Sequence, residues 1–529
     1  MSDKRASFAL ALVITAAVFA AGFSRIADLD FWWHLQTGKV IVSAHEIPRQ
    51  DIYSFTARGH EYIDHEWLFQ ILIFIIYSHF GPAGIAIAKC LVISAIFVIA
   101  ALYAVARGAP PIAVGGITLL AIAGGITRFI ERPEVLSTLF AVLTYVLLDR
   151  YAQTGDRRPL FALPLLCALW ANIHAAVIVG LVIQVCFIAA GFGLRRLAAA
   201  FTLLASIAAT CLNPYGYRVL LVPFELTRII SSGVLNNEEW RNPTLFKTPF
   251  FFVALLLTVI ALIRPFRPVN VLVGAFLAYV SLRYIRNVGL FCAFVPILTA
   301  PSLAQFRRVW TAITAPLGAV ALAVVLTIYY PFQRGVGEAW YFPDGLVRYT
   351  RENDLRGNML NSYGFGGYLI WTLWPERPIF IDGRNEVFLS LMERLAVARR
   401  DSLAWNALLR DYAIEYALVD YVDDLERVTA IGTDGRTTTT LVPVTNTRFP
   451  RPRWALVYWD DDGMIFLKRS GVNAPATEYT ALYPEGRGYQ KQLIESGAVD
   501  RSLALAELQR KLREDPKSRR ARALLQSFQ

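Results

Sequence analysis

The amino-acid sequence predicts a polytopic α-helical membrane protein with about eleven membrane spans and a C-terminal soluble α/β domain. Of its 529 residues, 55% are hydrophobic and only 18% are charged, below the roughly 25% charged residues of soluble proteins. Long apolar stretches recur from Phe8 to Tyr330. After Pro331 the chain has frequent carboxylates, turn residues and mixed periodicities, so we expect a soluble domain there.

Each predicted span is an apolar segment that approaches or reaches the about 17–25 residues needed to cross a bilayer. The first apolar segment is longer than the ~7–15 residues of a signal-peptide core, which favours a membrane anchor. The long run 159–193 is divided at Asn172–His174. The predicted spans are 7–23, 83–106, 111–127, 134–149, 159–173, 174–193, 197–212, 249–263, 268–282, 287–304 and 309–330.

The arginines between the spans predict the orientation, because cytoplasmic loops carry an excess of Lys and Arg. With Lys4 and Arg5 in the cytoplasm, alternation of the spans puts every arginine-rich loop on the same side. These arginines are Arg107, Arg150, Arg157, Arg158, Arg195, Arg196, Arg264, Arg267, Arg307 and Arg308. The apolar segment 67–80 must then lie along the membrane surface without crossing it, and the C-terminus is predicted to be non-cytoplasmic.

The predicted domains follow from the change along the chain from long apolar stretches to a mixed composition. A transmembrane domain covers 1–330 and includes a long first outer loop, 24–82. A soluble α/β domain covers 331–475, with strands expected at 358–361, 378–381 and 416–419 and in a hairpin, 454–459 and 464–468, around Asp460-Asp-Asp-Gly463. The tail 476–529 is expected to be helical and similar to a single tetratricopeptide unit.

Charge and cysteine content exclude some classes of function. The net charge is +11, but the basic residues are scattered between apolar runs, so no nucleic-acid partner is predicted. All five cysteines lie within apolar runs without a CxxC motif, which indicates small buried side chains and no disulfide framework.

The first outer loop begins with acidic residues beside aromatic ones, in the order Asp28-Leu-Asp30-Phe-Trp-Trp-His34. A carboxylate held against aromatic rings near the membrane surface has a raised pKa and can act as a general base. Asp30 is the better candidate and Asp28 the second. Alternatively, Trp32 and Trp33 form an interfacial aromatic belt and the aspartates are merely solvated.

Polar residues of the other outer segments converge on the same side of the predicted topology. Ionisable groups at span ends are functional candidates, although arginines there also extend to lipid headgroups and Glu131 could form a structural ion pair with Arg128 or Arg132. The candidates with a basic side chain are Arg128, Arg132, Arg283 and Arg286. The other cavity candidates are His34, His65, Glu66, Glu131, Asn172, His174 and Glu239.

The sequence does not identify a metal. His60, Asp64, His65 and Glu66 could form a site, but no HExxH or comparable spacing is present. Mg²⁺ or Mn²⁺ between carboxylates and a phosphate is favoured over zinc, and no cofactor is assigned.

Several short motifs together resemble a known superfamily. They are Asp30-Phe-Trp-Trp-His-Leu35, His65-Glu-Trp-Leu68, Trp170-Ala-Asn-Ile-His174 and Gly366-Gly-Tyr-Leu-Ile-Trp371 followed by Asp382-Gly-Arg384. With the acidic first outer loop and the arginine-bearing second outer turn, the chain resembles the GT-C superfamily of membrane glycosyltransferases. It is similar to bacterial membrane proteins grouped near the dolichyl-phosphate-mannose mannosyltransferases.

This resemblance implies transfer of a sugar from a polyprenyl-phosphate-linked donor to a glycan, lipid or protein acceptor. It implies Asp30 or Asp28 as the base and Arg128, Arg132, Arg283 or Arg286 as contacts to the donor phosphate. It also implies a multi-pass protein of the bacterial cytoplasmic membrane with a periplasmic C-terminal domain. The chain lacks a WWDYG-type motif, which argues against asparagine glycosylation.

Two other functions share these features. A transporter or flippase of a lipid-linked saccharide would have a similar basic cavity, but the sequence contains no convincing internal repeat. A non-catalytic protein of envelope polysaccharide assembly would use the outer domain and the C-terminal helices to position other enzymes.

Overall fold

The computed structural model describes residues 2–191, 194–231, 233, 238–329, 335–339, 341–422, 424–431, 437–474 and 477–528. The chain forms two compact units. A helical unit comprises Met1–Ile47 and Ile63–Ala339, and a mixed α/β unit comprises Pro48–Tyr62 and Trp340–Gln529. The predicted domain boundaries at 330/331 and 475/476 fall outside the described residues, so they stay predictions.

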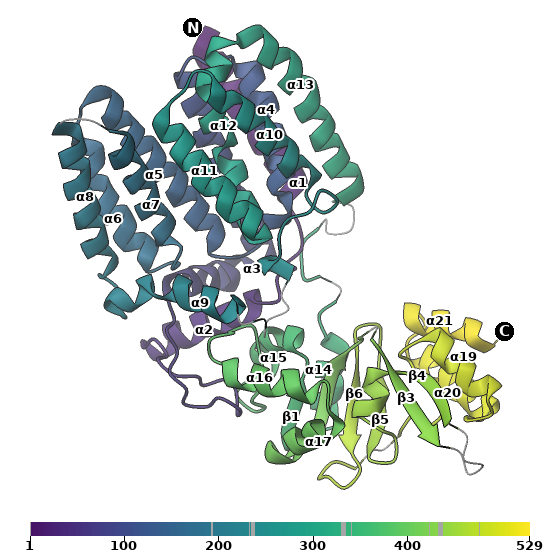
Figure 1. Ribbon diagram of the computed structural model, residues 1–529. Coiled ribbons are helices and arrows are strands. Elements are labelled where there is room, and N and C mark those ends of the chain that lie inside the picture. The colour runs from purple at the N-terminus through teal and green to yellow at the C-terminus, as the bar shows by residue number, and fades with distance from the viewer. Residues whose placement is uncertain are drawn as a thin grey trace. The chain divides into compact units, whose positions relative to one another are not determined.

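Within the residues that the structure describes, the helical unit has six helices long and apolar enough to cross a membrane and five shorter apolar helices; Figure 1 shows their arrangement. Every predicted span corresponds to one of them, which confirms a multi-pass membrane protein. The helices are α1 Ser2–Gly22, α2 Phe31–Ala44, α3 Trp67–Ala106, α4 Pro111–Gly125, α5 Glu134–Thr154, α6 Arg158–Ala171, α7 Val177–Ala190, α8 Leu194–Thr210, α9 Val222–Ser231, α10 Pro249–Ile263, α11 Pro268–Arg283, α12 Val288–Gln305 and α13 Arg307–Val324.

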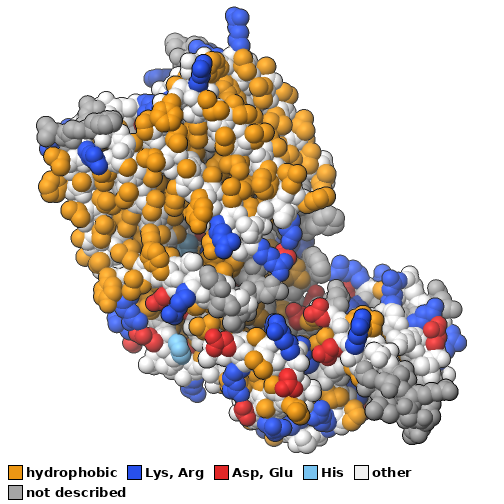
Figure 2. Space-filling view, in the orientation of Figure 1, with side chains coloured by type: hydrophobic (Ala, Val, Ile, Leu, Met, Phe, Trp, Pro, Cys, Tyr) orange, Lys and Arg blue, Asp and Glu red, His pale blue; other side chains and the backbone are white. Residues whose placement is uncertain are grey.

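Close helix packing in this unit depends on small residues. Helix α4 packs against α1, α10, α12 and α13. Gly116 of α4 and Gly318 of α13 face each other, and a Cβ atom on either would overlap the backbone of the other helix. Small residues of this kind let membrane helices approach closely. Hydrophobic side chains cover most of the surface of this unit in Figure 2, as expected for contact with lipid.

The ends of α3 and α5 and the start of α11 lie close together, as the predicted alternation of the spans requires. Asp149, at the end of α5, accepts hydrogen bonds from Tyr103 of α3 (2.6 Å) and from Arg267 before α11 (3.1 Å). Its carboxylate also accepts a hydrogen bond from Gln153 and lies 3.7 Å from Arg107, after α3. The C-terminal ends of α3 and α5 and the start of α11 therefore meet at one end of the unit.

Helix α3 changes direction in its middle. Gly81 has φ 59° and ψ −158°, and Pro82 follows it, so the segments 67–80 and 82–106 are separate helical stretches. The first stretch packs on α2, where Gly38 lies against the backbone of Gln70. The predicted position of 67–80 along the membrane surface stays a prediction.

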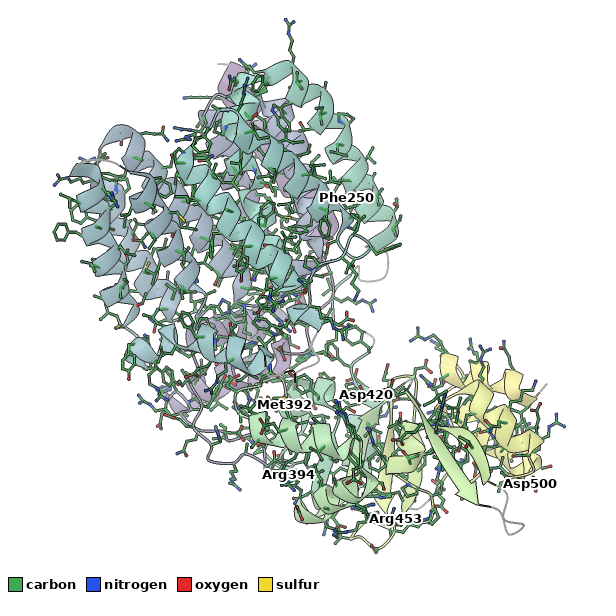
Figure 3. All side chains as sticks on the ribbon, in the orientation of Figure 1. Phe250, Met392, Arg394, Asp420, Arg453 and Asp500 are labelled. Atoms are coloured by element: carbon green, nitrogen blue, oxygen red, sulfur yellow. The ribbon has the colours of Figure 1, made fainter. Side chains whose placement is uncertain are left out.

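The α/β unit is built on a four-stranded sheet of order β1-β2-β6-β5. Strand β1 is parallel to β2, and the β2–β6 and β6–β5 pairs are antiparallel. The strands are β1 Asn358–Asn361, β2 Ile414–Asp420, β3 Leu425–Ile431, β4 Thr437–Pro443, β5 Trp454–Trp459 and β6 Gly463–Lys468. Strands β3 and β4 form a separate antiparallel pair, which was not predicted from the sequence. Asp420, labelled in Figure 3, ends β2 and accepts a hydrogen bond from Ser362 after β1.

The helices of this unit are α14 Asp344–Glu352, α15 Gly366–Leu373, α16 Leu389–Ala398, α17 Ser402–Asp411, α18 Val444–Arg448, α19 Arg487–Glu495, α20 Arg501–Glu514 and α21 Arg519–Leu525. Helices α20 and α21 pack together around the turn at Asp515-Pro516. Their N-termini are capped by Asp500 and Ser518, whose side chains accept backbone N–H hydrogen bonds.

One predicted strand is wrong. Residues 378–381 form only an isolated bridge, in which Ile379 pairs with Ser54. The segment 48–62 of the first outer loop thus packs with the C-terminal unit. Arg384 binds it through Asp51 at 2.6 Å, and it also pairs with Asp382 at 2.6 Å. The side chains of Asp51, Asp382 and Arg384 are almost fully buried. The Asp382-Gly-Arg384 motif therefore has a structural role.

Candidate functional site

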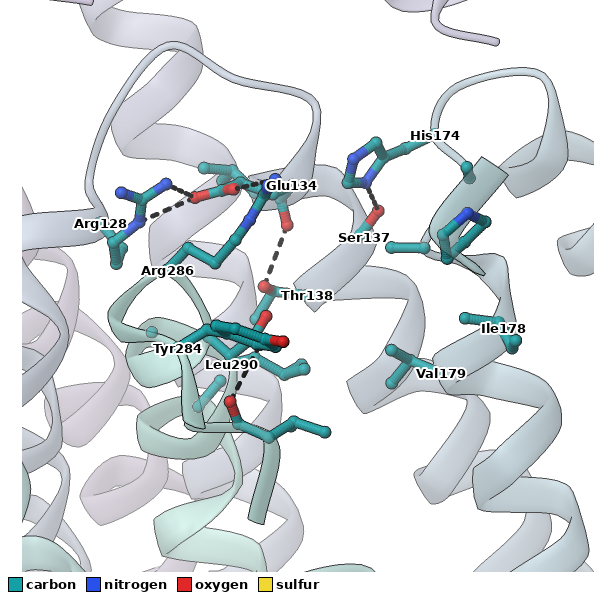
Figure 4. A pocket seen from close by; sticks show the side chains of 18 of the residues that line it. Arg128, Glu134, Ser137, Thr138, His174, Ile178, Val179, Tyr284, Arg286 and Leu290 are labelled. Atoms are coloured by element: carbon teal, nitrogen blue, oxygen red, sulfur yellow. Dashed lines mark hydrogen bonds and ion pairs between the residues drawn. The ribbon is translucent and has the colours of Figure 1, made fainter. Parts of the chain in front are cut away.

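A cavity of about 340 Å³ lies within the helical unit, and its lining changes from apolar to charged. Residues such as Ile93, Phe97, Val179 and Leu290 form the apolar walls. The polar lining comes from side chains at helix ends and connecting turns. It includes His65, Arg128, Glu134, Ser137, His174, Trp240, Tyr284 and Arg286. Figure 4 labels all of these except His65 and Trp240.

Arg132, in the turn before α5, joins three acidic residues. It contacts both carboxylate oxygens of Asp28, one of them at 2.9 Å, and pairs with Asp30 at 2.8 Å and with Glu239 at 2.7 Å. Asp28 also accepts a hydrogen bond from the backbone N–H of Asp30 at 2.9 Å. Asp28 therefore positions both Arg132 and the backbone at Asp30.

A second group of charges lines the cavity. Arg128, in the 3₁₀ turn Ile126–Arg128, contacts Glu134 and pairs with Glu239 at 3.0 Å. Arg286, in the turn Ile285–Asn287, lies 3.4 Å from the second carboxylate oxygen of Glu134 and stacks over the ring of Trp240 at 4.3 Å. Figure 4 shows both guanidinium groups converging on Glu134. Glu239 bridges this group and the Arg132 group.

Two acidic residues of the cluster have pKa values shifted in opposite directions. Burial raises the pKa of Asp30 to about 6; Arg132 opposes this change, while Asp28 and Glu239 add to it. Burial also raises the pKa of Glu239, but Arg132 and Arg128 outweigh it and lower the value to about 2. Asp30 is thus the carboxylate of this pair suited to exchange a proton near neutral pH.

A histidine group adjoins the cavity. His34 of α2, His65 before α3 and His174 between α6 and α7 each place Nε2 3.7 Å from a carboxylate oxygen of Glu66. His65, Glu66 and His174 form a cluster whose ligand atoms are close enough to share a metal ion.

Three predicted candidates lie apart from these contacts. Glu131 pairs with Lys89 at 2.6 Å, not with Arg128 or Arg132 as the structural alternative proposed. Asn172 accepts a hydrogen bond from Trp67 and donates to the carbonyls of Ala168 and Leu212, so it connects helix ends. Arg283 is exposed, stacks beside Tyr284 and does not line the cavity. Its predicted role as a phosphate contact stays untested.

Several residues in or near the site were not predicted from the sequence. Lys89, the partner of Glu131 outside the cavity lining, is a single lysine in the apolar run 83–106, so the rarity of charge in a span could have indicated it. Glu134 is the first residue of the predicted span 134–149, so an ionisable group at a span end could have indicated it. Trp240 and Ser137 carry no sequence signal, because only the packing of distant helices brings them to the cavity.

No family model matches the sequence, and no curated protein matches it. Among solved structures, the chain is similar to the oligosaccharyltransferase of Archaeoglobus fulgidus in its apo form. The TM-score is 0.53 at 11% identity, over 82% of this chain and 74% of that chain. The complex of the same enzyme with Zn and sulfate gives a TM-score of 0.50 at 13% identity, over 81% and 73%.

The chain shares the fold of this oligosaccharyltransferase. At 11–13% identity the likeness concerns the fold alone. It confirms the predicted fold class, a mostly helical protein with several long apolar helices and a C-terminal α/β region.

Proposed function

We propose that this chain is a membrane glycosyltransferase that moves a sugar from a polyprenyl-phosphate-linked donor to an acceptor on the non-cytoplasmic face. The main observation is the cavity, whose apolar walls end at a cluster of arginines and carboxylates. An isoprenoid chain would occupy the apolar part, and its phosphate would lie at the charged end. The related fold occurs in an oligosaccharyltransferase, which agrees with a lipid-linked donor.

Arg128 and Arg286 are the proposed contacts to the donor phosphate, because both line the cavity and both already bind the carboxylate of Glu134. A phosphate would replace that carboxylate as their partner and form charge-assisted hydrogen bonds. Arg132 does not line the cavity. Its proposed part is to hold Asp28, Asp30 and Glu239 in place beside it.

In the proposed reaction, Asp30 accepts the proton of the acceptor hydroxyl. The hydroxyl oxygen forms a bond to the anomeric carbon, and the bond from that carbon to the phosphate oxygen breaks. The polyprenyl phosphate leaves with the bonding electron pair, and Arg128 and Arg286 stabilise its negative charge. Asp28 acts as a positioning residue through Arg132.

The test uses the purified full-length chain in lipid nanodiscs. Undecaprenyl phosphate carrying radiolabelled mannose, glucose or galactose is supplied with candidate acceptors, and release of undecaprenyl phosphate is measured. The proposal predicts turnover with one of these donors and its loss in Asp30→Asn. Translocation of the same lipids in proteoliposomes, without release of undecaprenyl phosphate, would instead identify a flippase.

A further inference from the structure

The carboxylate of Glu66 lies among three imidazole rings of the helical unit. Each Nε2 is 3.7 Å from one of its oxygens, beyond the about 2.7–3.2 Å of a direct N–H···O hydrogen bond. Neighbouring ligands of a tetrahedral zinc ion lie about 3.3 Å apart, given zinc–ligand bonds near 2.0–2.1 Å. The spacing around Glu66 is therefore closer to that of ligands around an ion than to that of a hydrogen-bonded pair.

In His65 and His174, the contact made by Nδ1 determines whether Nε2 can act as a metal ligand. Nδ1 of His65 lies 3.2 Å from the carbonyl oxygen of Ile63, which can only accept a hydrogen bond, so this nitrogen carries the proton. Nδ1 of His174 lies 2.8 Å from the hydroxyl of Ser137, which already accepts the indole N–H of Trp170 at 2.8 Å. With Nδ1–H donating outward, Nε2 of His65 presents a lone pair toward Glu66. Nε2 of His174 does the same when the hydroxyl of Ser137 accepts from its Nδ1 as well as from Trp170. This is how second-layer contacts orient metal-binding histidines.

His34 has the opposite arrangement. The side-chain amide nitrogen of Gln70 faces its Nδ1 at 3.5 Å and also donates to Asp64 at 2.8 Å. Nδ1 of His34 thus accepts, and its Nε2–H points at the second oxygen of Glu66. His34 would hold the carboxylate in place and leave the first oxygen, which faces His65 and His174, for an ion.

We propose that His65, Glu66 and His174 bind a divalent transition-metal ion, for which zinc is the best candidate. Two imidazoles and one carboxylate are a zinc ligand set, and three protein ligands leave a fourth position open. His65 and His174 both line the cavity, so the open position is accessible from it. Two imidazole ligands disfavour Mg²⁺, which prefers oxygen.

The charges around the cavity also favour a cation at this point. The four carboxylates of Asp28, Asp30, Glu134 and Glu239 face the three guanidinium groups of Arg128, Arg132 and Arg286. Glu66 adds a further negative charge. A divalent ion on Glu66 would offset this excess before an anionic ligand enters.

The test measures metal content and affinity and is independent of glycosyl transfer. The full-length chain, purified in detergent without a polyhistidine tag, is stripped with a chelator and titrated with Zn²⁺ against a competing zinc indicator. We expect one zinc ion per chain and a loss of affinity of more than about 100-fold in His65→Gln, Glu66→Gln and His174→Gln. His34→Gln should weaken binding by about 10- to 100-fold, as removal of an outer-layer partner does.

His79→Gln is the matched control, because His79 is an exposed histidine of α3 outside the cluster. Size-exclusion chromatography identifies variants that fail to fold, and Co²⁺ bound to the wild-type chain provides a second measurement through its visible absorption. A tetrahedral Co²⁺ spectrum that is lost in His174→Gln would support the site. Zinc affinity equal in the wild type and all three ligand variants, or no binding by the wild type, would overturn it.

Discussion

At the scale of single residues, Asp28 and Asp30 show how neighbours of the same type acquire different roles. Asp28 is buried, makes two contacts with Arg132 and accepts the backbone N–H of Asp30. Asp30 remains partly exposed and makes one contact with Arg132. The preference for Asp30 as the base stays a prediction, and its expected raised pKa agrees with the structure.

Asp30→Asn should lower turnover of a lipid-linked sugar by about 10²–10⁴-fold, because the variant keeps the shape of the side chain but cannot accept the proton. Binding of undecaprenyl phosphate should remain within a few fold. Turnover and binding are measured on the same purified sample. Near-normal turnover in both Asp30→Asn and Asp28→Asn would remove the catalytic role of this loop.

The pH dependence of the wild-type chain follows from the pKa of Asp30, which burial raises to about 6. A base must be deprotonated to act, so turnover should be independent of pH above this value and fall about tenfold per pH unit below it. Initial rates between about pH 4.5 and 8 test this. A rate unchanged down to pH 4.5 would contradict the assignment of Asp30.

Arg128→Ala and Arg286→Ala should each weaken binding of undecaprenyl phosphate by about 10- to 100-fold, the value of a charge-assisted contact of roughly 1.5–3 kcal/mol. Arg283→Ala is the informative comparison. The sequence predicts the same loss for it, whereas its exposed position outside the cavity lining predicts little change. Equal binding by all three variants would leave these arginines as anchors at the lipid headgroups.

At the scale of elements, the helices formed where long apolar segments predicted them, while one strand did not form. Residues 378–381 have the apolar character of a strand, yet only Ile379 pairs, and its partner Ser54 lies in the first outer loop. A short apolar run indicates that a segment is buried, but it does not show with which segment its backbone forms hydrogen bonds.

Gly116→Ala should destabilise the packing of α4 on α13 by about 1–3 kcal/mol, because its Cβ would overlap the backbone at Thr314 and Ala315. Gly115→Ala on the same helix is the control, since its Cβ would meet only the end of the Leu10 side chain. Thermal denaturation in detergent, followed by size-exclusion chromatography, should show a lower midpoint for Gly116→Ala alone. Equal midpoints would contradict the close contact.

Arg384→Ala should destabilise the α/β unit by about 3–5 kcal/mol, because it leaves Asp51 and Asp382 buried without their cation. Arg394→Ala removes an exposed pair with Asp411 and should cost about 0–1 kcal/mol. Limited proteolysis of the full-length chain should therefore cut segment 48–62 faster in Arg384→Ala only. Similar cleavage of both variants would show that the segment is held by other contacts.

At the scale of the whole molecule, the arrangement of span ends agrees with the predicted topology. The group around Asp149 collects the ends of α3, α5 and α11, as alternating spans require. The orientation of these ends toward the cytoplasm rests on the arginines and stays a proposal.

Reporter fusions after residue 339 should give a non-cytoplasmic signal, and fusions in the loop between α10 and α11 should give a cytoplasmic one. Alkaline phosphatase and green fluorescent protein, which are active on opposite sides of the bacterial membrane, measure this. A cytoplasmic signal after residue 339 would reverse the topology and contradict the proposed non-cytoplasmic position of the cavity.

The sequence by itself determined the membrane class, the spans and the arginine pattern, because each depends on local properties. Bilayer thickness sets the length of an apolar segment, and loop charge sets its orientation. The acidic start of the first outer loop was predicted for the same reason, since Asp28 and Asp30 directly follow a span.

Only the tertiary structure decided which of these residues meet. Glu239 joins Arg128 and Arg132, His174 joins Glu66, and Arg384 joins Asp51, all across long stretches of chain. These contacts depend on how the helices pack and on where the loops lie in the folded chain. Neither the periodicity nor the spacing of residues in the sequence predicts such packing. The histidine group around Glu66 is therefore visible only in the folded chain, because its members come from α2, the start of α3 and the turn after α6.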